Sequence, residues 1–158
     1  MKQTRIKSKQ FKQELQAAGY SEEQISISKK DSIIVCEDKD QQVKIIKINN
    51  QIAFFYYSEK LIPTLKFLQK YPNLLKKVTV DMGAIKFVAG GADIMRPGIK
   101  KIDQDITKDQ IVAIVDETHG TAICLGKALL DTQEMQSKQT GKSLKNVHFI
   151  GDKIWNLI

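Results

Sequence analysis

The spacing of apolar residues is helical at the start of the chain. Between Phe11 and Ala18 they recur at three- and four-residue intervals, which predicts a short amphipathic helix. Ser8 is placed to cap this helix and Gly19 to end it. Residues 21–24 read Ser-Glu-Glu-Gln, the spacing of a capping box, and predict a second short helix.

Beyond residue 30 the apolar residues form β-branched and aromatic runs. Three runs, residues 33–36, 43–48 and 52–57, are separated by Asp-Lys-Asp and Asn-Asn, which are common turn residues. We predict that they form a three-stranded antiparallel meander. A helix that begins near Ile62, with Pro63 near its first turn, is expected next because its apolar residues fall on one face.

Short strands and glycine turns alternate in the second half. Asp81 is placed to cap a helix over residues 82–89, and residues 132–138 form another helical segment. Strands are predicted at residues 78–80, 92–95, 111–116, 121–130, 147–150 and 153–157. Many short strands with glycine turns are typical of a small barrel. The fold class is therefore α+β, with an N-terminal α/β meander domain at residues 1–76 and a β barrel domain at residues 77–158.

The charge distribution favours a polyanionic partner, chiefly for the N-terminal half. The net charge is +7. Residues 1–76 hold 14 Lys or Arg against 8 Asp or Glu, a net of +6, whereas residues 77–158 hold 11 against 10, a net of +1. Such an excess is typical of nucleic-acid binding, but lysine also serves solubility, so charge alone leaves both interpretations open.

The reactive side chains form no recognisable catalytic motif. His119 is expected in a hairpin turn and His148 in a strand, and neither has a cysteine or serine at motif spacing. The carboxylates at residues 103–105 and 116–117 are expected in solvated loops. Both cysteines lie in apolar runs and are expected to be buried thiols. No catalytic residue, metal site or cofactor is therefore predicted.

The chain carries no sign of a membrane segment. No apolar run approaches the ~18 residues needed to cross a bilayer. The basic start lacks the apolar core of a secretory signal. A cytoplasmic location without a membrane partner is expected.

One segment, residues 81–99, is a candidate ligand contact. It reads as a capped helix that enters a double glycine, then a strand and an Arg-Pro-Gly turn. Lys86 and Arg96 flank the glycines, and two lysines follow the turn. Glycines let backbone approach a ligand and let amides point at a phosphate, so this combination predicts a phosphate contact. The alternative is a structural helix stop and turn. Phe87 is expected in the core because it falls on the apolar helix face.

This segment resembles the signature of PUA domains, named for pseudouridine synthases and archaeosine transglycosylases. Together with PTLKFLQKYP at residues 63–72, it resembles the domain junction of the malignant T-cell-amplified-sequence family and its archaeal relatives. The likeness covers about residues 50–157, whereas residues 1–48 are similar in length and general pattern. Further matching runs are residues 111–115, 122–126, 146–149 and 151–155.

The resemblance implies a C-terminal PUA-type β pseudo-barrel that contacts RNA, often near a tRNA acceptor end or a structured stem. Eukaryotic relatives pair with the density-regulated protein and act at the small ribosomal subunit. The expected partners are therefore RNA (tRNA or rRNA), the small ribosomal subunit and a partner like the density-regulated protein. The expected RNA-binding residues are Lys86, Gly90, Gly91, Arg96, Pro97, Gly98, Lys100 and Lys101.

Three functional classes are compatible with these observations. The first is a non-catalytic RNA-binding protein of translation initiation or recycling. The second is a tRNA-modification-associated protein or an enzyme accessory subunit, although about 76 residues outside the PUA half are few for a catalytic core. The third is a protein-binding ribosome adaptor, with the aromatic run at residues 54–57 as its partner face.

Overall fold

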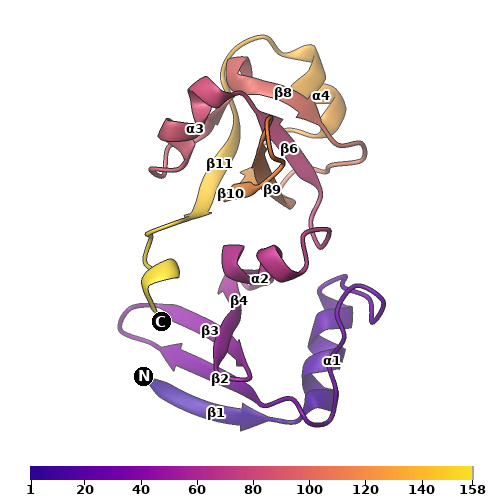
Figure 1. The fold of residues 1–158 in the computed structure, drawn as a ribbon, viewed down its shortest axis with the longest axis vertical. Coiled ribbons are helices and arrows are strands. Elements are labelled where there is room, and N and C mark those ends of the chain that lie inside the picture. Colours follow the sequence, from indigo (N-terminus) through magenta and orange to yellow (C-terminus); the bar gives the residue numbers. More distant parts are fainter. Residues whose placement is uncertain (158) are drawn as a thin grey trace. The chain divides into compact units, whose positions relative to one another are not determined.

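The computed structural model describes residues 1–157 as two compact units, Met1–Leu74 and Leu75–Leu157 (Figure 1). Each unit has its own sheet and its own buried apolar residues. None of the helices among the described residues combines the length and the apolar character needed to cross a membrane.

The N-terminal unit is built on an antiparallel sheet. Its strands are β1 (Lys2–Ile6), β2 (Ile33–Asp38), β3 (Val43–Ile48), β4 (Gln51–Tyr57) and β5 (Lys60–Pro63), in that spatial order. The predicted meander forms the centre, β2 to β4, and two edge strands extend it. β1 escaped prediction because four of its five residues are exposed, so no apolar alternation marks it. β5 contains Ile62 and Pro63, which were wrongly assigned to the following helix.

Two helices pack aromatic side chains against the middle of this sheet. They are α1 (Ser8–Ala17) and α2 (Leu65–Lys70). Phe11 of α1 and Phe67 of α2 both contact Phe54 of β4, with ring centroids 5.7 and 4.9 Å apart. Phe11 and Phe54 are completely buried, so this aromatic cluster fixes both helices on one face of the sheet.

The helix caps differ from those predicted. α1 begins after Lys7, which makes no side-chain capping hydrogen bond, so Ser8 is not its cap. α2 begins after Thr64, whose hydroxyl accepts a hydrogen bond from the Phe67 N–H at 3.2 Å. Gly19 does follow α1 with a positive φ of 95°, as expected of a helix stop.

The predicted second helix at residues 21–24 is a turn. The Ser21 N–H donates to the Gln24 side chain and the Gln24 N–H donates to the Ser21 hydroxyl, so the capping box does form. Ile25 and Ile27 are both buried, and this alternation belongs to extended backbone. Tertiary burial therefore stops the helix after one turn.

The C-terminal unit is built on a mixed sheet. Its strands are β6 (Lys77–Val80), β7 (Ile94–Met95), β8 (Ile99–Ile102), β9 (Ile111–Asp116), β10 (Ala122–Ala128) and β11 (Lys142–Phe149). Their spatial order is β7-β11-β10-β9-β6-β8, with β6 and β9 parallel and the other pairs antiparallel. One core cluster receives side chains from every strand, including Val80, Ile94, Ile99, Ile114, Cys124 and Leu144. The two edge strands, β7 and β8, are joined by residues 96–98 alone, so the sheet curls until its edges lie near each other, as in a barrel.

Four short helices are described in this unit. They are α3 (Met82–Val88), η1 (Arg96–Gly98), α4 (Thr132–Ser137) and η2 (Trp155–Leu157). The expected final strand at residues 153–157 is wrong. The Asp152 carboxylate accepts hydrogen bonds from the Phe149 and Trp155 N–H groups, both at 2.9 Å, and these bonds turn the chain into η2. Two further stretches, β8 and the first five residues of β11 from Lys142 onward, are strand where none was predicted.

Candidate nucleic-acid interface

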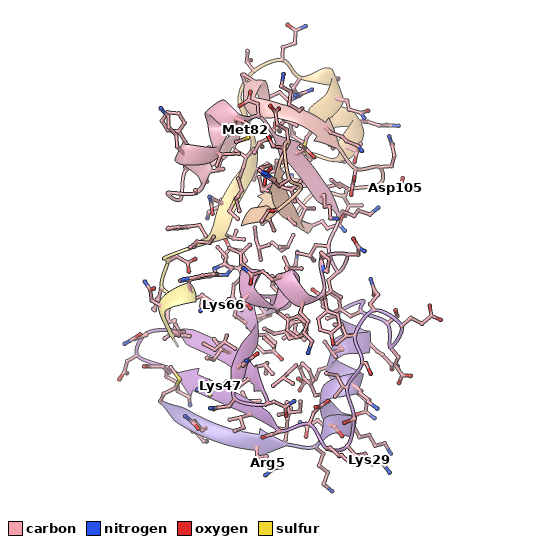
Figure 2. All side chains as sticks on the ribbon, viewed as in Figure 1. Arg5, Lys29, Lys47, Lys66, Met82 and Asp105 are labelled. Atoms are coloured by element: carbon pink, nitrogen blue, oxygen red, sulfur yellow. The ribbon has the colours of Figure 1, made fainter. Side chains whose placement is uncertain are left out.

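The short helix α3, which begins at Met82 (labelled in Figure 2), turns one face to solvent. The Asp81 carboxylate accepts a hydrogen bond from the Ala84 N–H at 2.9 Å, so the predicted cap is confirmed. Ala84, Ile85 and Val88 pack against the core of the unit. Exposed residues at the helical spacing i, i+3, i+4 and i+7 are Gly83, Lys86, Phe87 and, just beyond the helix, Gly90; Met82 is exposed as well.

Phe87 is exposed, contrary to the expectation that it fills the core. It is 60% exposed, and the Lys86 Nζ lies 5.1 Å from the centroid of its ring. Val88, one residue later, fills the core instead, and this phase of the helix points Phe87 outward. An exposed aromatic ring beside a cation can stack on a base while the cation meets a phosphate.

The glycine pair after α3 ends the helix and does not present free amides. The N–H groups of Gly90 and Gly91 donate to the carbonyl oxygens of Phe87 and Val88, both at 3.1 Å. The expectation that these amides point at a phosphate is therefore wrong. Gly91 has a φ of +102°, and a Cβ there would lie 2.8 Å from the Phe149 ring, so the position requires glycine.

Asn146 of β11 holds the glycine loop, the segment from Val88 to Ala92 that contains both glycines, against the sheet. Its Nδ2 donates to the carbonyl oxygens of Val88 at 2.8 Å and Ala92 at 2.9 Å. Its backbone N–H donates to the Asp93 carboxylate at 2.9 Å, and Lys142 Nζ lies 2.7 Å from the other oxygen of that group. The Lys142 hydrogen bond, followed by that from Asn146, lowers the pKa of Asp93. These bonds hold both ends of the loop.

Arg96 stabilises η1, the short helix that follows β7 and of which it is the first residue. Its Nε donates to the Met135 carbonyl at 2.6 Å and its Nη1 to the Ile99 carbonyl at 3.1 Å, which ties η1 to α4 and β8. The half-buried guanidinium is thus engaged in the fold through two of its three nitrogens. Gly98 allows η1 to approach α3, because a Cβ there would lie 2.9 Å from the Ala84 Cβ.

The predicted RNA-binding residues therefore separate into two sets. Lys100 and Lys101 are both exposed on β8, an edge strand that begins directly after η1. The exposed set consists of Lys86, Gly90, Pro97, Lys100 and Lys101. The support set, whose members shape the backbone, consists of Gly91, Arg96 and Gly98.

The turn between β9 and β10 lies beside the start of α3, a neighbour that the sequence analysis missed. The Thr118 hydroxyl lies 3.2 Å from the Met82 sulfur, and the side chain of His119 is exposed. Asp116 is buried, contrary to the expectation of a solvated loop. Its carboxylate accepts hydrogen bonds from the N–H groups of His119, Thr121 and Thr118, with the His119 bond the largest cause of its lowered pKa. His119 therefore joins the candidate interface.

The cysteines, His148 and Asp152 lie in positions that serve the fold. Among residues 1–157, no three His, Cys, Asp or Glu side chains gather in a group that could hold a metal ion. Both cysteines are buried as expected, and burial raises the pKa of Cys124 to about 12. His148 is completely buried, with its Nδ1 2.8 Å from an oxygen of Asp152. Burial would raise the pKa of Asp152, but the hydrogen bonds from His148, Trp155 and Phe149 outweigh it and lower that pKa.

Comparison with known proteins identifies this architecture. Residues 76–150 match the PUA domain, and residues 6–71 match a domain of unknown function (DUF1947). The chain is 40% identical to an uncharacterized protein of Methanocaldococcus jannaschii, over 94% of this chain and 90% of that protein. It is 34% identical to translation machinery-associated protein 20 of Saccharomyces cerevisiae, over 98% of this chain and 87% of that protein. The chain belongs to the translation machinery-associated protein 20 family.

The chain is also 34% identical to malignant T-cell-amplified sequence 1 of Rattus norvegicus, over 74% of this chain and 66% of that protein, so the resemblance seen in the sequence is confirmed. The whole fold recurs in the crystal structure of a hypothetical protein from Pyrococcus horikoshii, with a TM-score of 0.81 and 28% identity over 98% of both chains. All residues of the exposed and support sets lie in the PUA domain. Family similarity also reaches the N-terminal unit, where the sequence analysis recognised only length and general pattern.

Proposed function

We propose that this chain binds RNA in translation through its PUA domain and performs no catalysis itself. The contact surface is the exposed face of α3 together with the rest of the exposed set. The observation that carries the proposal is the exposed Phe87 ring with the Lys86 ammonium beside it, at the edge of a loop held by Asn146. The RNA is a tRNA or rRNA at the small ribosomal subunit, met in the cytoplasm during initiation or recycling.

Each part of this surface has a physical role. Phe87 offers a ring on which an unpaired base can stack, an interaction that contributes about 1–3 kcal/mol per base. Lys86 neutralises a neighbouring phosphate, and Lys100 and Lys101 extend the positive surface along β8. Arg96 and the glycines of the support set preserve the shape of the surface without meeting the RNA.

Titration of the full chain with fluorescein-labelled deacylated tRNA tests this proposal. We expect Lys86→Ala/Phe87→Ala to weaken binding about tenfold or more and to lower the log–log salt slope by about one, because one phosphate contact is lost. The matched control is Lys138→Ala/Ile150→Ala, which removes one exposed lysine and one exposed apolar side chain elsewhere in the same unit. Equal affinity in the first variant, or an equal loss in the control, contradicts the proposal.

A second candidate is docking of a protein partner like the density-regulated protein. Its support is the exposure of large apolar side chains on α3 and β7, where Met82 is 51%, Phe87 60% and Met95 48% exposed. Exposed apolar side chains of this size are common at protein interfaces. A nuclease-resistant complex with such a partner, disrupted by Phe87→Ala at unchanged tRNA affinity, would assign this face to protein docking.

A further inference from the structure

We propose that the N-terminal unit carries a basic groove that binds the sugar-phosphate backbone of duplex RNA. The groove lies between the end of β1, the start of α1 and the turn at residues 28–31. Its charged lining consists of Arg5, Lys7, Lys9, Lys29 and Asp31. Figure 2 labels Arg5 and Lys29 at the same end of the unit. This inference deepens the proposed function, on which it rests for the class of ligand, by adding a second contact.

The four cations of the groove are not neutralised by the fold. All four are exposed, and the salt bridges found among residues 1–157 involve other side chains. The carboxylate in the lining, Asp31, is already engaged. It accepts hydrogen bonds from the Ser28 N–H at 2.8 Å and from the Asn49 Nδ2 at 2.9 Å. These two bonds, Ser28 first, lower the pKa of Asp31. With four cations against this one carboxylate, the groove lining carries an excess of positive charge.

Ordered backbone sets the spacing of these cations. Arg5 lies on β1, where it pairs with Ile34 of β2, and Lys7 and Lys9 bracket the first residue of α1. The first turn of α1 contains no acidic side chain that would compete with an incoming anion. On the opposite wall, Lys29 lies in a turn that the Asp31–Asn49 hydrogen bond ties to the end of β3. Because these cations are attached to three ordered elements, their backbone positions are already set to meet consecutive phosphates. Binding therefore loses less conformational entropy than it would with a flexible segment.

The composition of the groove favours nucleic acid over protein. Protein interfaces centre on aromatic and apolar anchors, whereas protein–nucleic acid interfaces are more polar and strongly positive. The large exposed apolar side chains of the described chain, which include Met82 and Phe87, all lie outside this lining. Without an aromatic ring, the groove has no platform for an unpaired base. The ligand it fits is therefore duplex backbone, bound without regard to sequence.

The experiment uses the full chain and a blunt-ended RNA duplex of about 16 base pairs, the span of a typical shape-specific duplex contact. The groove variant is Arg5→Glu/Lys29→Glu. Its control is Lys2→Glu/Lys39→Glu, which makes the same charge change at exposed positions of the same unit outside the groove lining. We expect the groove variant to bind the duplex about tenfold more weakly, with a salt slope lower by about two, and the control to change less than about threefold.

The groove proposal is overturned if the groove variant binds the duplex like the parental chain or if the control loses as much. It is also overturned if the parental chain does not bind the duplex. In that case an acidic protein is the alternative ligand of the groove. Binding of tRNA by Lys86→Ala/Phe87→Ala is measured separately, so either proposal can fail while the other stands. Should charge reversal unfold the unit, Arg5→Gln/Lys29→Gln gives the same comparison with a smaller expected loss.

Discussion

The side-chain nitrogen of Asn146 lies 2.8 Å from the carbonyl oxygen of Val88, which fixes the C-terminal end of α3 to strand β11. A second bond from the same nitrogen, 2.9 Å long, reaches the carbonyl of Ala92 on the other side of the glycine pair. The partners are 58 and 54 residues away in sequence. The shape of the candidate interface therefore depends on a late strand as well as on the segment that carries the exposed side chains.

Replacement of Asn146 tests the strength of this clamp. Asn146→Ala leaves the carbonyl oxygens of Val88 and Ala92 without this donor, the Val88 bond being part-buried, so we expect the free energy of unfolding to fall by about 1–3 kcal/mol. Urea denaturation measures this change. Lys145→Ala, an exposed neighbour on the same strand, is the control and should stay within about 0.5 kcal/mol of the parental chain. A loss no larger than that of the control would show that the clamp is dispensable.

The adjacent glycines should respond differently to the same substitution. Gly91→Ala places a Cβ 2.8 Å from the Phe149 ring at a residue with φ +102°, so we expect a loss of about 1–3 kcal/mol. Gly90→Ala has an ordinary φ, and its Cβ would lie no closer than 3.6 Å to the backbone, so stability should change by less than about 0.5 kcal/mol. Thermal unfolding of the pair provides the measurement. Equal effects at both positions would contradict this assignment.

The parts of the fold that the sequence predicted are those with local signals. The meander strands are β-branched runs between turn residues, and Asp81 stands directly before its helix. β1 and β8 were missed for the opposite reason: four of the five residues of β1 are exposed, and in β8 two exposed lysines separate the two isoleucines, so neither strand shows an apolar alternation. Edge strands of this kind are defined by backbone pairing with a neighbour, which leaves little trace in local hydrophobicity.

The candidate site was predictable in position but not in the roles of its residues. The segment at residues 81–99 was found from its glycines and cations. Whether Phe87 or Val88 enters the core depends on the rotation of α3 against the barrel, and a helix of seven residues is too short for its own spacing to decide this. The engagement of Arg96 was equally hidden, since its acceptors belong to Met135 and Ile99 on other elements.

Substitutions of Arg96 and Lys86 should have opposite effects on stability and on the salt dependence of tRNA binding. Arg96→Ala removes two hydrogen bonds from a charged donor to carbonyl oxygens, and we expect it to lower the free energy of unfolding by about 1.5–3 kcal/mol or more. Under conditions where the variant stays folded, the salt slope of its tRNA binding should equal that of the parental chain. Lys86→Ala should show the reverse: parental stability and a slope lower by about one. A stable Arg96→Ala variant with a reduced slope would restore Arg96 as a direct phosphate contact.

The buried carboxylate of Asp116 should make stability depend on acid pH. Hydrogen bonds from the N–H groups of His119, Thr121 and Thr118 favour the ionised carboxylate in the folded state, so its pKa lies below the unfolded value of about 3.9. A lowered folded-state pKa adds stability that is complete above the unfolded pKa and is lost as pH falls through the folded pKa.

Asp116→Asn removes this titration while keeping the size of the side chain. We expect the variant to be less stable than the parental chain near pH 7, because a neutral amide accepts the three N–H groups less well. Its urea midpoint should then fall less steeply as the pH drops below the unfolded aspartate pKa of about 3.9 and through the lower folded-state pKa, where the parental carboxylate becomes protonated. Part of the parental slope will persist, because Asp31, Asp93 and Asp152 also have lowered pKa values. Glu117→Gln, an exposed carboxylate beside the turn, should keep the parental steepness; parallel curves for Asp116→Asn and the parental chain would refute the assignment.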